Sequence, residues 1–280
     1  MSYQNLTKPI MQFLSLFEFP MVLEIGIDNG QTAIPLCHNI THLDRSWVYE
    51  GVDIDVKLDV ISQLSVMNKV YCHGTSMGSE NQFPTNVFLY EMNSFEFLKI
   101  AIENKRKYNL ILIDGDHNYL TVKKELPLAE QLANPSTLII CDDYNTAHAH
   151  TDFYYGERED YADNKLANKR QKTEKTGVRP AVDEFVENSQ GKWGIVPGLG
   201  NPTDYCILYQ KENVLDMNLY QPKDAKLASS GVLEVYFNID KCPKVKESAL
   251  VNLDHNYERA GPRVAFNLDL LQGESVREKE

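Results

Sequence analysis

The stretch Met21 to Gly30, MVLEIGIDNG, decides the fold. Its apolar residues Met21, Val22, Leu23 and Ile25 lack the alternation of a half-exposed strand, which is typical of a parallel strand buried on both faces. The run stops at Gly26 and Gly30, and a residue without Cβ lets backbone N–H groups approach a ligand closely and allows turns with positive φ. A buried strand that ends in such a turn indicates a nucleotide-type site, with the Glu24 carboxylate beside the ligand.

The turn lacks the motifs of two common phosphate-binding sites, and this limits the class of ligand that it can bind. The spacing E-x-G-x-x-x-G differs from the G-x-G-x-x-G of dinucleotide folds, and the Gly-Lys-Ser/Thr of a phosphate loop is missing. A carboxylate at the turn would also repel a phosphate, by roughly 4 kcal/mol at close range and moderate dielectric. The turn therefore favours a cationic or hydroxyl-bearing ligand, and its pattern resembles motif I of the class I S-adenosylmethionine (SAM) methyltransferases.

Length, charge and cysteine content exclude several classes of protein. A chain of 280 residues holds one α/β domain with an appendage, and a formal net charge of −12 disfavours a nucleic-acid partner. The sequence has no window of 18 apolar residues and its N-terminus lacks the features of a signal peptide, so we expect no membrane association and a cytoplasmic protein. Five cysteines without a C-x-x-C pair indicate reduced thiols.

Two further strands predict contacts to a nucleotide. Residues 47–54 read as a strand that ends in alternate acids, and the acid closing the second strand of a doubly wound fold commonly meets ribose hydroxyls. Asp53 is the better candidate for that contact and Asp55 the alternative. Residues 69–73 read as a short third strand, followed by small residues including Ser76 that would suit an adenine edge; residues 77–91 read as a polar excursion.

Acidic residues follow two buried strands further along the chain. Residues 108–113 lead into Asp114-Gly-Asp116-His117, and residues 137–141 lead into Asp142-Asp143. The carboxyl ends of parallel strands share one edge of a sheet, and several carboxylates brought together need a cation or protons. Oxygen ligands of this kind select a hard ion such as Mg²⁺. Helix N-capping is the alternative, but it explains only one acid at each strand end.

The acidic motifs also carry a family resemblance. D-G-D-H-x-Y, followed by L-I-I-x-D-D-Y and by G-V-x-P-A-V-x-E-F, is similar to SAM-dependent O-methyltransferases of the macrocin and mycinamicin sugar type and to the cephalosporin hydroxylase-like group. The resemblance implies a doubly wound, Rossmann-like, mostly parallel sheet of seven strands, with Mg²⁺ held by Asp114, Asp142 and Asp143. It implies His117 or Asp116 as the base, with Asp114 shared between the metal and the methionine moiety of SAM.

The resemblance defines the expected domain organisation. It runs from Val22 to about Lys211, so we expect a methyltransferase domain over residues 1–211 and an extension over residues 212–280. Residues 145–176 are strongly polar and follow the fifth strand, which predicts a mobile lid over the site; His148 and His150 within it are expected to face solvent.

The extension itself is expected to be a small β structure. Residues 231–239 and 263–271 alternate enough to be strands of a hairpin or of a homo-oligomer contact, and residues 274–280 are expected to be disordered.

The resulting hypothesis is metal-assisted methyl transfer from SAM to a hydroxyl of a small molecule, such as a sugar or a vicinal diol. Two alternatives stay open. One is a metal-independent SAM methyltransferase in which His117 is the sole base. The other is a catalytically inactive nucleotide-fold protein that serves binding or assembly.

Overall fold

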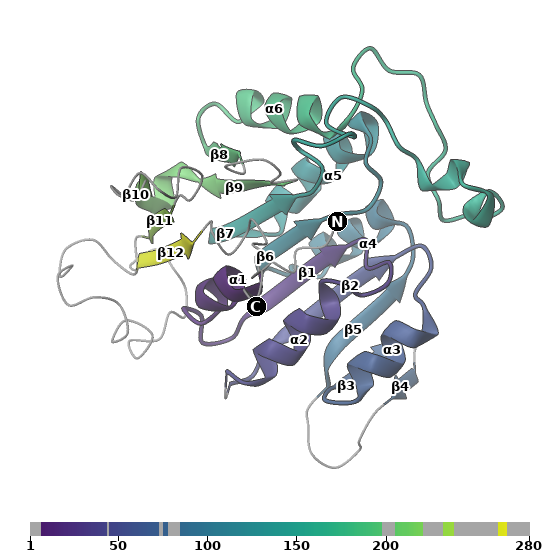
Figure 1. The fold of residues 1–280 in the computed structure, drawn as a ribbon, viewed down its shortest axis with the longest axis horizontal. Helices are drawn as coiled ribbons and strands as arrows, with labels where there is room; N and C mark the ends of the chain where they lie inside the picture. The colour runs from purple at the N-terminus through teal and green to yellow at the C-terminus, as the bar shows by residue number, and fades with distance from the viewer. Residues whose placement is uncertain are drawn as a thin grey trace, which may run out of the picture.

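A mixed β-sheet forms the centre of the protein. The computed structural model describes residues 7–43, 45–72, 75–77, 85–197, 205–220, 232–237 and 263–267. Within these ranges the sheet has nine strands in the order β4-β3-β5-β2-β1-β6-β7-β9-β8 (Figure 1). They are β1 (Met21–Ile25), β2 (Val48–Asp53), β3 (Lys69–Cys72), β4 (Thr75–Met77), β5 (Thr85–Glu91), β6 (Tyr108–Ile113), β7 (Ala133–Cys141), β8 (Trp193–Pro197) and β9 (Cys206–Gln210).

In the described ranges, six α-helices cover the two faces of this sheet. They are α1 (Thr7–Leu14), α2 (Ala33–Thr41), α3 (Leu58–Ser65), α4 (Ser94–Glu103), α5 (Tyr119–Gln131) and α6 (Val178–Asn188). Buried side chains of α1, α2 and α3 pack in one apolar cluster, and those of α4, α5 and α6 pack in another. Figure 1 shows the first set in front of the sheet and the second behind it. None of the helices in the described ranges has the length and apolar character needed to cross a membrane.

The strand order reverses beside β1. This strand pairs with β2 on one side and with β6 on the other, and both pairs are parallel. β5 and β3 continue outward from β2, whereas β7 continues outward from β6. Ligands of open α/β sheets bind at such a reversal, in the crevice outside the carboxyl ends of the strands. The topology therefore places a binding crevice at the turn after β1.

The predicted doubly wound, mostly parallel fold is confirmed, with more strands than the expected seven. The antiparallel pair β3 and β4 forms an added edge, and the remaining strands of the sheet number seven. The interpretation of residues 77–91 as a polar excursion is wrong for Thr85–Glu91, which is β5 and pairs between β2 and β3. Val87 and Leu89 are buried there, because alternate residues of a strand face the same side.

The helix after the glycine turn, α2, contains a proline near its start. Pro35 does not interrupt it, and α2 continues to Thr41. Pro35 is the third residue of the helix, where its missing N–H has no intrahelical acceptor to lose.

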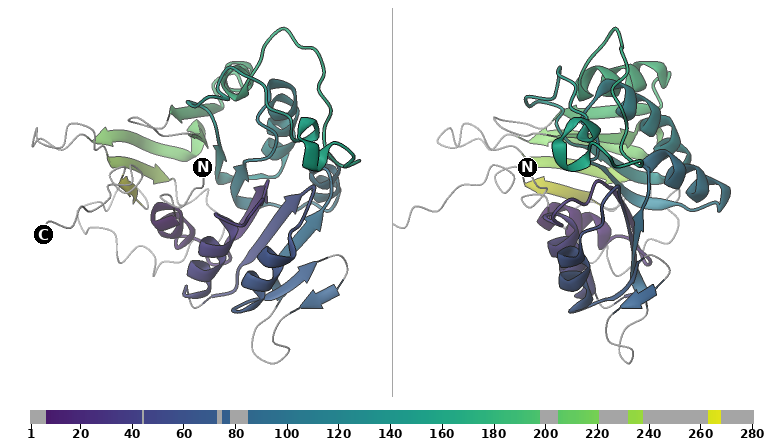
Figure 2. Two further views of the ribbon diagram at one scale, coloured as in Figure 1. Left: turned by 45° about the vertical axis from the view of Figure 1, so that its right-hand side comes forward. Right: turned by 90° about the vertical axis from the view of Figure 1, so that its right-hand side faces the viewer.

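The C-terminal extension contains a second sheet. β10 (Val214–Tyr220), β11 (Val232–Phe237) and β12 (Arg263–Asn267) pair in that order and are antiparallel. This small sheet lies beside the main one, with β12 near α1 (Figure 2). The division of the chain at residue 211 and the role of the extension as an oligomer contact stay predictions, and residues 274–280 lie outside the described residues.

Candidate active site

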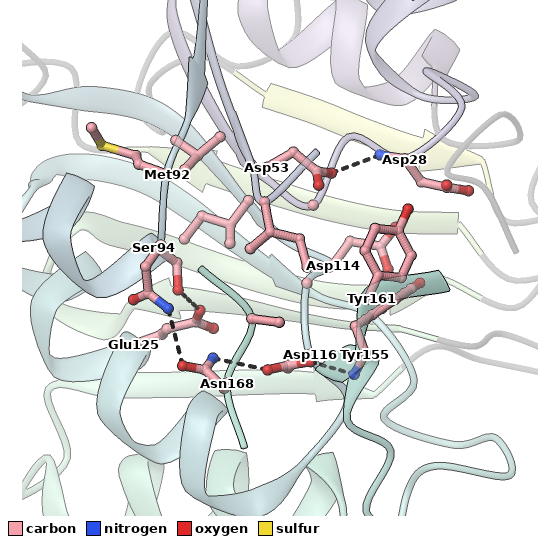
Figure 3. A pocket seen from close by; sticks show the side chains of 17 residues that line it. Asp28, Asp53, Met92, Ser94, Asp114, Asp116, Glu125, Tyr155, Tyr161 and Asn168 are labelled. Carbon is pink, nitrogen blue, oxygen red and sulfur yellow. Dashed lines mark hydrogen bonds between the residues drawn. The ribbon is translucent and has the colours of Figure 1, made fainter. Parts of the chain in front are cut away.

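Two adjoining pockets open at the carboxyl edge of the sheet. The first, which we call the β2-side pocket, has among its lining residues Val52, Asp53, Met92, Ser94, Glu125 and Asn168 (Figure 3). The second, the β7-side pocket, has among its lining residues Glu24, Asp114, His117, Asp142, Asp143 and His148. Gly26 and Asp114 line both pockets, so the two meet where the strand order reverses.

Backbone hydrogen bonds align the strand ends at this edge. The N–H of Gly26 donates to Val52 O at 2.8 Å, and the N–H of Asp114 donates to Ile25 O at 2.8 Å. The N–H of Asp142 continues the series by donating to Ile113 O at 3.0 Å. The sheet register therefore brings the residues after β1, β6 and β7 side by side.

The glycine turn depends on the missing Cβ of Gly26. Its φ is +87°, and a Cβ at this position would lie 2.1 Å from the carbonyl oxygen of Asp114. Gly26 thus lets the turns after β1 and β6 touch, which an L side chain would prevent. Gly30 also has a positive φ, +72°. It does not line either pocket, so its location does not support the predicted ligand contact.

Asp53 holds the turn in shape. Its Oδ2 accepts hydrogen bonds from the N–H groups of Ile27 at 2.7 Å and Asp28 at 2.9 Å, and its Oδ1 accepts from Asp55 N–H at 3.0 Å. Burial raises the pKa of Asp53, and these backbone bonds partly offset the rise. The carboxylate faces the β2-side pocket, where the predicted ribose contact would be made.

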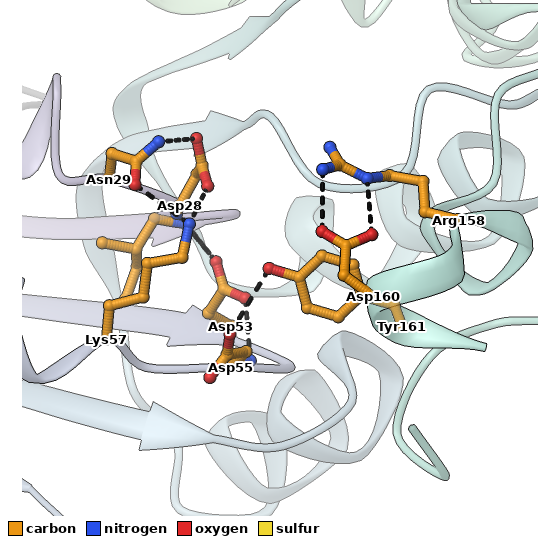
Figure 4. A network of polar contacts seen from close by, with 9 residues as sticks. Asp28, Asn29, Asp53, Asp55, Lys57, Arg158, Asp160 and Tyr161 are labelled. Carbon is orange, nitrogen blue, oxygen red and sulfur yellow. Dashed lines mark hydrogen bonds and ion pairs between the residues drawn. The ribbon is translucent and has the colours of Figure 1, made fainter. Parts of the chain in front are cut away.

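Side chains of the 145–176 segment reach this rim. Tyr161 OH donates to Asp55 Oδ2 at 3.4 Å (Figure 4). Asn164 Nδ2 donates to Ile54 O at 2.9 Å. On the other side of the turn, Lys57 pairs with Asp28. The predicted lid therefore crosses the carboxyl edge from the end of β7 to the end of β2 and is tied to it by hydrogen bonds.

Ser76 lies away from both pockets. It belongs to β4, at the outer edge of the sheet, and β3 and β5 separate that strand from β2. The small polar residue that does line the β2-side pocket is Ser94, which follows the strand that sequence reasoning missed.

Glu24 is buried beneath the β7-side pocket. Only 1% of it is exposed, and Tyr49 OH donates to its Oε2 at 2.7 Å. Burial raises the pKa of Glu24 to about 8, although the bond from Tyr49 opposes the rise. A cationic group in the pocket would be stabilised by ionised Glu24.

Asp114, His117 and Asp142 form a compact acidic group in the β7-side pocket. One potential ligand atom from each lies within 4.8 Å of the others. Burial and then the charge of Asp142 raise the pKa of Asp114 well above its ordinary value, and burial raises the pKa of Asp142. Two adjacent carboxyl groups of this kind favour a shared proton or a cation. The oxygen and imidazole donors fit a divalent ion such as Mg²⁺ or Mn²⁺.

Asp143 lies outside this group and orients His117. Its Oδ2 accepts from His117 Nδ1 at 2.9 Å, and Thr146 Oγ1 donates to its other oxygen. Burial alone would raise the pKa of Asp143, but the bond and the charge of His117 outweigh it and lower the pKa. The other ring nitrogen of His117, Nε2, lies 4.0 Å from Asp114 Oδ1. A carboxylate that accepts from one ring nitrogen fixes the direction of the other.

Asp116 belongs to the other pocket. Its carboxylate accepts from the N–H of Tyr155 at 2.9 Å and from Asn168 Nδ2 at 2.8 Å, and it lines the β2-side pocket. Both oxygens therefore hold the 145–176 segment in place, away from the acidic group.

Sequence reasoning missed two residues of the site. His148 was expected to face solvent, yet its ring stacks on His117 with centroids 5.6 Å apart, whereas His150 is exposed. No local pattern predicts this stacking. Glu125 lines the β2-side pocket and is 1% exposed. The sequence does contain a pattern that predicts its burial. Val122 and Ala129 lie at helical spacing on either side of Glu125 and face the core.

Solved structures resemble this chain at low sequence identity. An O-methyltransferase from Bacillus cereus, in complex with SAH, is 15% identical with a TM-score of 0.44, over 73% of this chain and 78% of that one. The O-methyltransferase TomG from Streptomyces achromogenes, in complex with SAM, is 13% identical with a TM-score of 0.45, over 74% and 78%. MycE from the mycinamycin pathway, in complex with Mg and SAH, is 14% identical with a TM-score of 0.40, over 72% and 47%.

A family model matches part of the chain. Residues 23–144 match the family described as "Methyltransferase domain". A comparison with curated proteins finds no significant match. The matched segment runs from β1 through the residues that follow β7, and thus contains the glycine turn and both acidic motifs. The segment that holds the glycine turn and the acidic motifs is therefore similar to a methyltransferase domain, in agreement with the predicted class.

Proposed function

We propose that the protein transfers the methyl group of SAM to a hydroxyl of a small molecule, assisted by a divalent metal ion. The observation that carries the proposal is the junction of the two pockets. A cavity with apolar walls beside Asp53 meets, at Gly26 and Asp114, a cavity that contains the acidic group. A donor that spans both would present its reactive end to the acidic group.

The residues of the junction fit SAM. The β2-side pocket offers apolar walls at Val52 and Met92 for a flat base and the Asp53 carboxylate for ribose hydroxyls. Glu24, in the adjoining pocket, would ionise next to the ammonium group of the methionine moiety, because an opposite charge lowers the pKa of a buried acid. Bound SAM supplies the electrophilic methyl group.

Asp114 and Asp142 are the proposed metal ligands. Their raised pKa values reflect a free-energy cost of ionisation that a cation would offset. The bound ion would act as a Lewis acid toward the acceptor oxygen. Asp143, which the sequence suggested as a third ligand, instead holds the His117 ring by its Nδ1–H.

His117 is the proposed base. Asp143 directs its Nε2 into the β7-side pocket, where it can take the proton of the acceptor hydroxyl. The oxygens of Asp116 are engaged in the other pocket, which favours His117 over Asp116. Because His117 also belongs to the compact acidic group, direct metal ligation is its alternative role.

The lining of the β7-side pocket favours a hydroxyl-rich acceptor. Asn29, Gln31 and Thr32 offer hydrogen-bonding groups, and Phe153 and Tyr155 offer ring faces. This combination suits a sugar or a diol whose ring carbons pack on an aromatic face.

Calorimetry and methyl-transfer assays test the proposal. We expect SAH to bind the native protein, and Mn²⁺ to bind the native protein but not Asp142→Asn. Transfer of radioactive methyl groups from SAM to a panel of nucleotide sugars and catechols should stop when EDTA is added. Asp160→Asn, a change on the exposed surface of the 145–176 segment, is the control and should bind both. Absence of SAH binding refutes the proposal, and transfer that persists in EDTA refutes the role of the metal.

The role of His117 is tested separately. If His117 is the base, His117→Gln should lower the rate of transfer while Mn²⁺ affinity stays the same. If it is a ligand, Mn²⁺ affinity should fall by about 10-fold to 100-fold.

A further inference from the structure

Glu125 presents a buried oxygen without a partner to the β2-side pocket. Its Oε1 accepts from Ser94 Oγ at 2.6 Å, whereas its Oε2 is buried and has no hydrogen-bond partner among the described residues. Of the described residues that line this pocket, Glu125 alone has such an atom. A buried acceptor left unpaired is costly, so its presence in a pocket wall indicates a ligand that donates to it.

The other polar groups on this side of the pocket are already paired. Asn168 donates to Asp116, and Asn93 donates to Asn168 Oδ1 at 3.0 Å (Figure 3). Asn93 Oδ1 in turn accepts from the N–H of Phe95 at 3.0 Å. A ligand therefore finds a preformed frame in which the Glu125 oxygen is the free acceptor.

The walls around Glu125 suit a flat, neutral ring. Val52, Ile54, Met92 and Ala167 contribute apolar surface to the same pocket. Burial raises the pKa of Glu125 to about 8, and a ligand that donates a hydrogen bond to Oε2 would offset part of this cost of ionisation. Figure 3 shows Asp53 and Glu125 on different sides of the pocket.

We propose that Glu125 Oε2 accepts a hydrogen bond from the 6-amino group of the adenine of SAM, and so makes the site specific for that base. The inference rests on the proposed function, because it assigns a residue to recognition of the same donor. Ser94 acts as a positioning residue, since its hydroxyl holds the other carboxyl oxygen of Glu125.

A thermodynamic cycle that combines one substitution in the protein with one change in the ligand measures the contribution of this hydrogen bond to binding. The ligand change compares SAH with its 6-deamino analogue, in which hydrogen replaces the amino group; the protein change is Glu125→Met, which keeps length and removes both oxygens. By calorimetry, the native protein should bind SAH about tenfold more tightly than the analogue. Glu125→Met should bind the two with affinities that agree within about threefold.

A matched control lies on the same helix. Glu130 is paired with Lys192 and Trp193 and lies outside the lining of the pocket. Glu130→Gln should keep the native preference for SAH. Far-UV circular dichroism and thermal unfolding check that each variant is folded.

The outcomes separate this inference from the proposed function. If the native protein binds neither ligand, the SAM site itself is refuted. If it binds both equally, the site stands and the role of Glu125 is overturned, whether or not Glu125→Met folds. A preference that survives in a folded Glu125→Met protein overturns it as well.

Discussion

Replacing Glu24 by Gln should change how the stability of the protein depends on pH. Burial raises the pKa of Glu24 from 4.5 to about 8, so between these values the folded protein holds a proton that the unfolded chain has lost. When the folded state binds more protons, the free energy of unfolding falls as pH rises. Native stability should therefore decline across this window and level off above pH 8.

The size of the effect follows from the change in pKa. One pKa unit corresponds to about 1.4 kcal/mol, so a rise from 4.5 to about 8 costs about 5 kcal/mol of stability by pH 8.5. The amide introduced by Glu24→Gln would keep an oxygen that accepts from Tyr49 OH and has no proton to lose. Glu24→Gln should match the native protein near pH 5 and exceed it by a few kcal/mol at pH 8.5.

Urea unfolding at several pH values between 5 and 8.5, with EDTA and without SAM, measures the difference. The titration of Glu125 is common to both proteins and cancels. Glu130→Gln is the control. Burial alone would raise the pKa of Glu130, but bonds from Lys192 and Trp193 lower it, so its contribution to stability is lost only on acidification. The difference in the free energy of unfolding between Glu130→Gln and the native protein should therefore be constant over this pH range. A difference between Glu24→Gln and native protein that does not change with pH would refute the reasoning.

Three further changes test other parts of the account. Asp142→Asn should reduce the rate of methyl transfer by about 100-fold, with SAH affinity in calorimetry kept within about threefold of native. Gly26→Ala should lower the free energy of unfolding by more than about 2 kcal/mol in urea, because of positive φ and a backbone clash, whereas Gly191→Ala, with a similar φ of +85° and open space around it, should cost about 1 kcal/mol. Asn168→Ala removes a donor to Asp116 and should speed limited proteolysis in the segment after β7, with no change expected when cleavage sites in other loops are followed.

The central strands could be predicted because short apolar stretches of sequence identify them, and a parallel sheet then places their carboxyl ends together. β1 and β6 are mostly apolar, with Glu24 and Asn109 as their only polar residues, which is typical of strands buried on both faces. Parallel strands end at one edge, so the sequence alone could bring Glu24 and Asp142 together, and both line the β7-side pocket.

Details that depend on contacts between distant residues could not be read from the sequence. Whether Asp143 points at a metal or at His117 is decided by side-chain direction within a loop, and two adjacent acids look alike in sequence. β5 begins with polar residues and follows a polar segment, so the alternation of buried and exposed residues along the strand was hard to recognise. Ser76 was therefore predicted for the adenine contact, although Ser94 is the serine that lines the β2-side pocket. Polar composition predicted a mobile 145–176 segment, but it does not reveal bonds such as the one from Asn164 to Ile54.

A crystal structure of the protein with SAH and Mn²⁺ would test the central claim most directly, since anomalous scattering locates the ion. We expect adenine in the β2-side pocket, ribose near Asp53, and an anomalous peak within bonding distance of Asp114 and Asp142 in the β7-side pocket. SAH bound away from the turn after β1, or an ion bound elsewhere while the acidic group holds none, would contradict it.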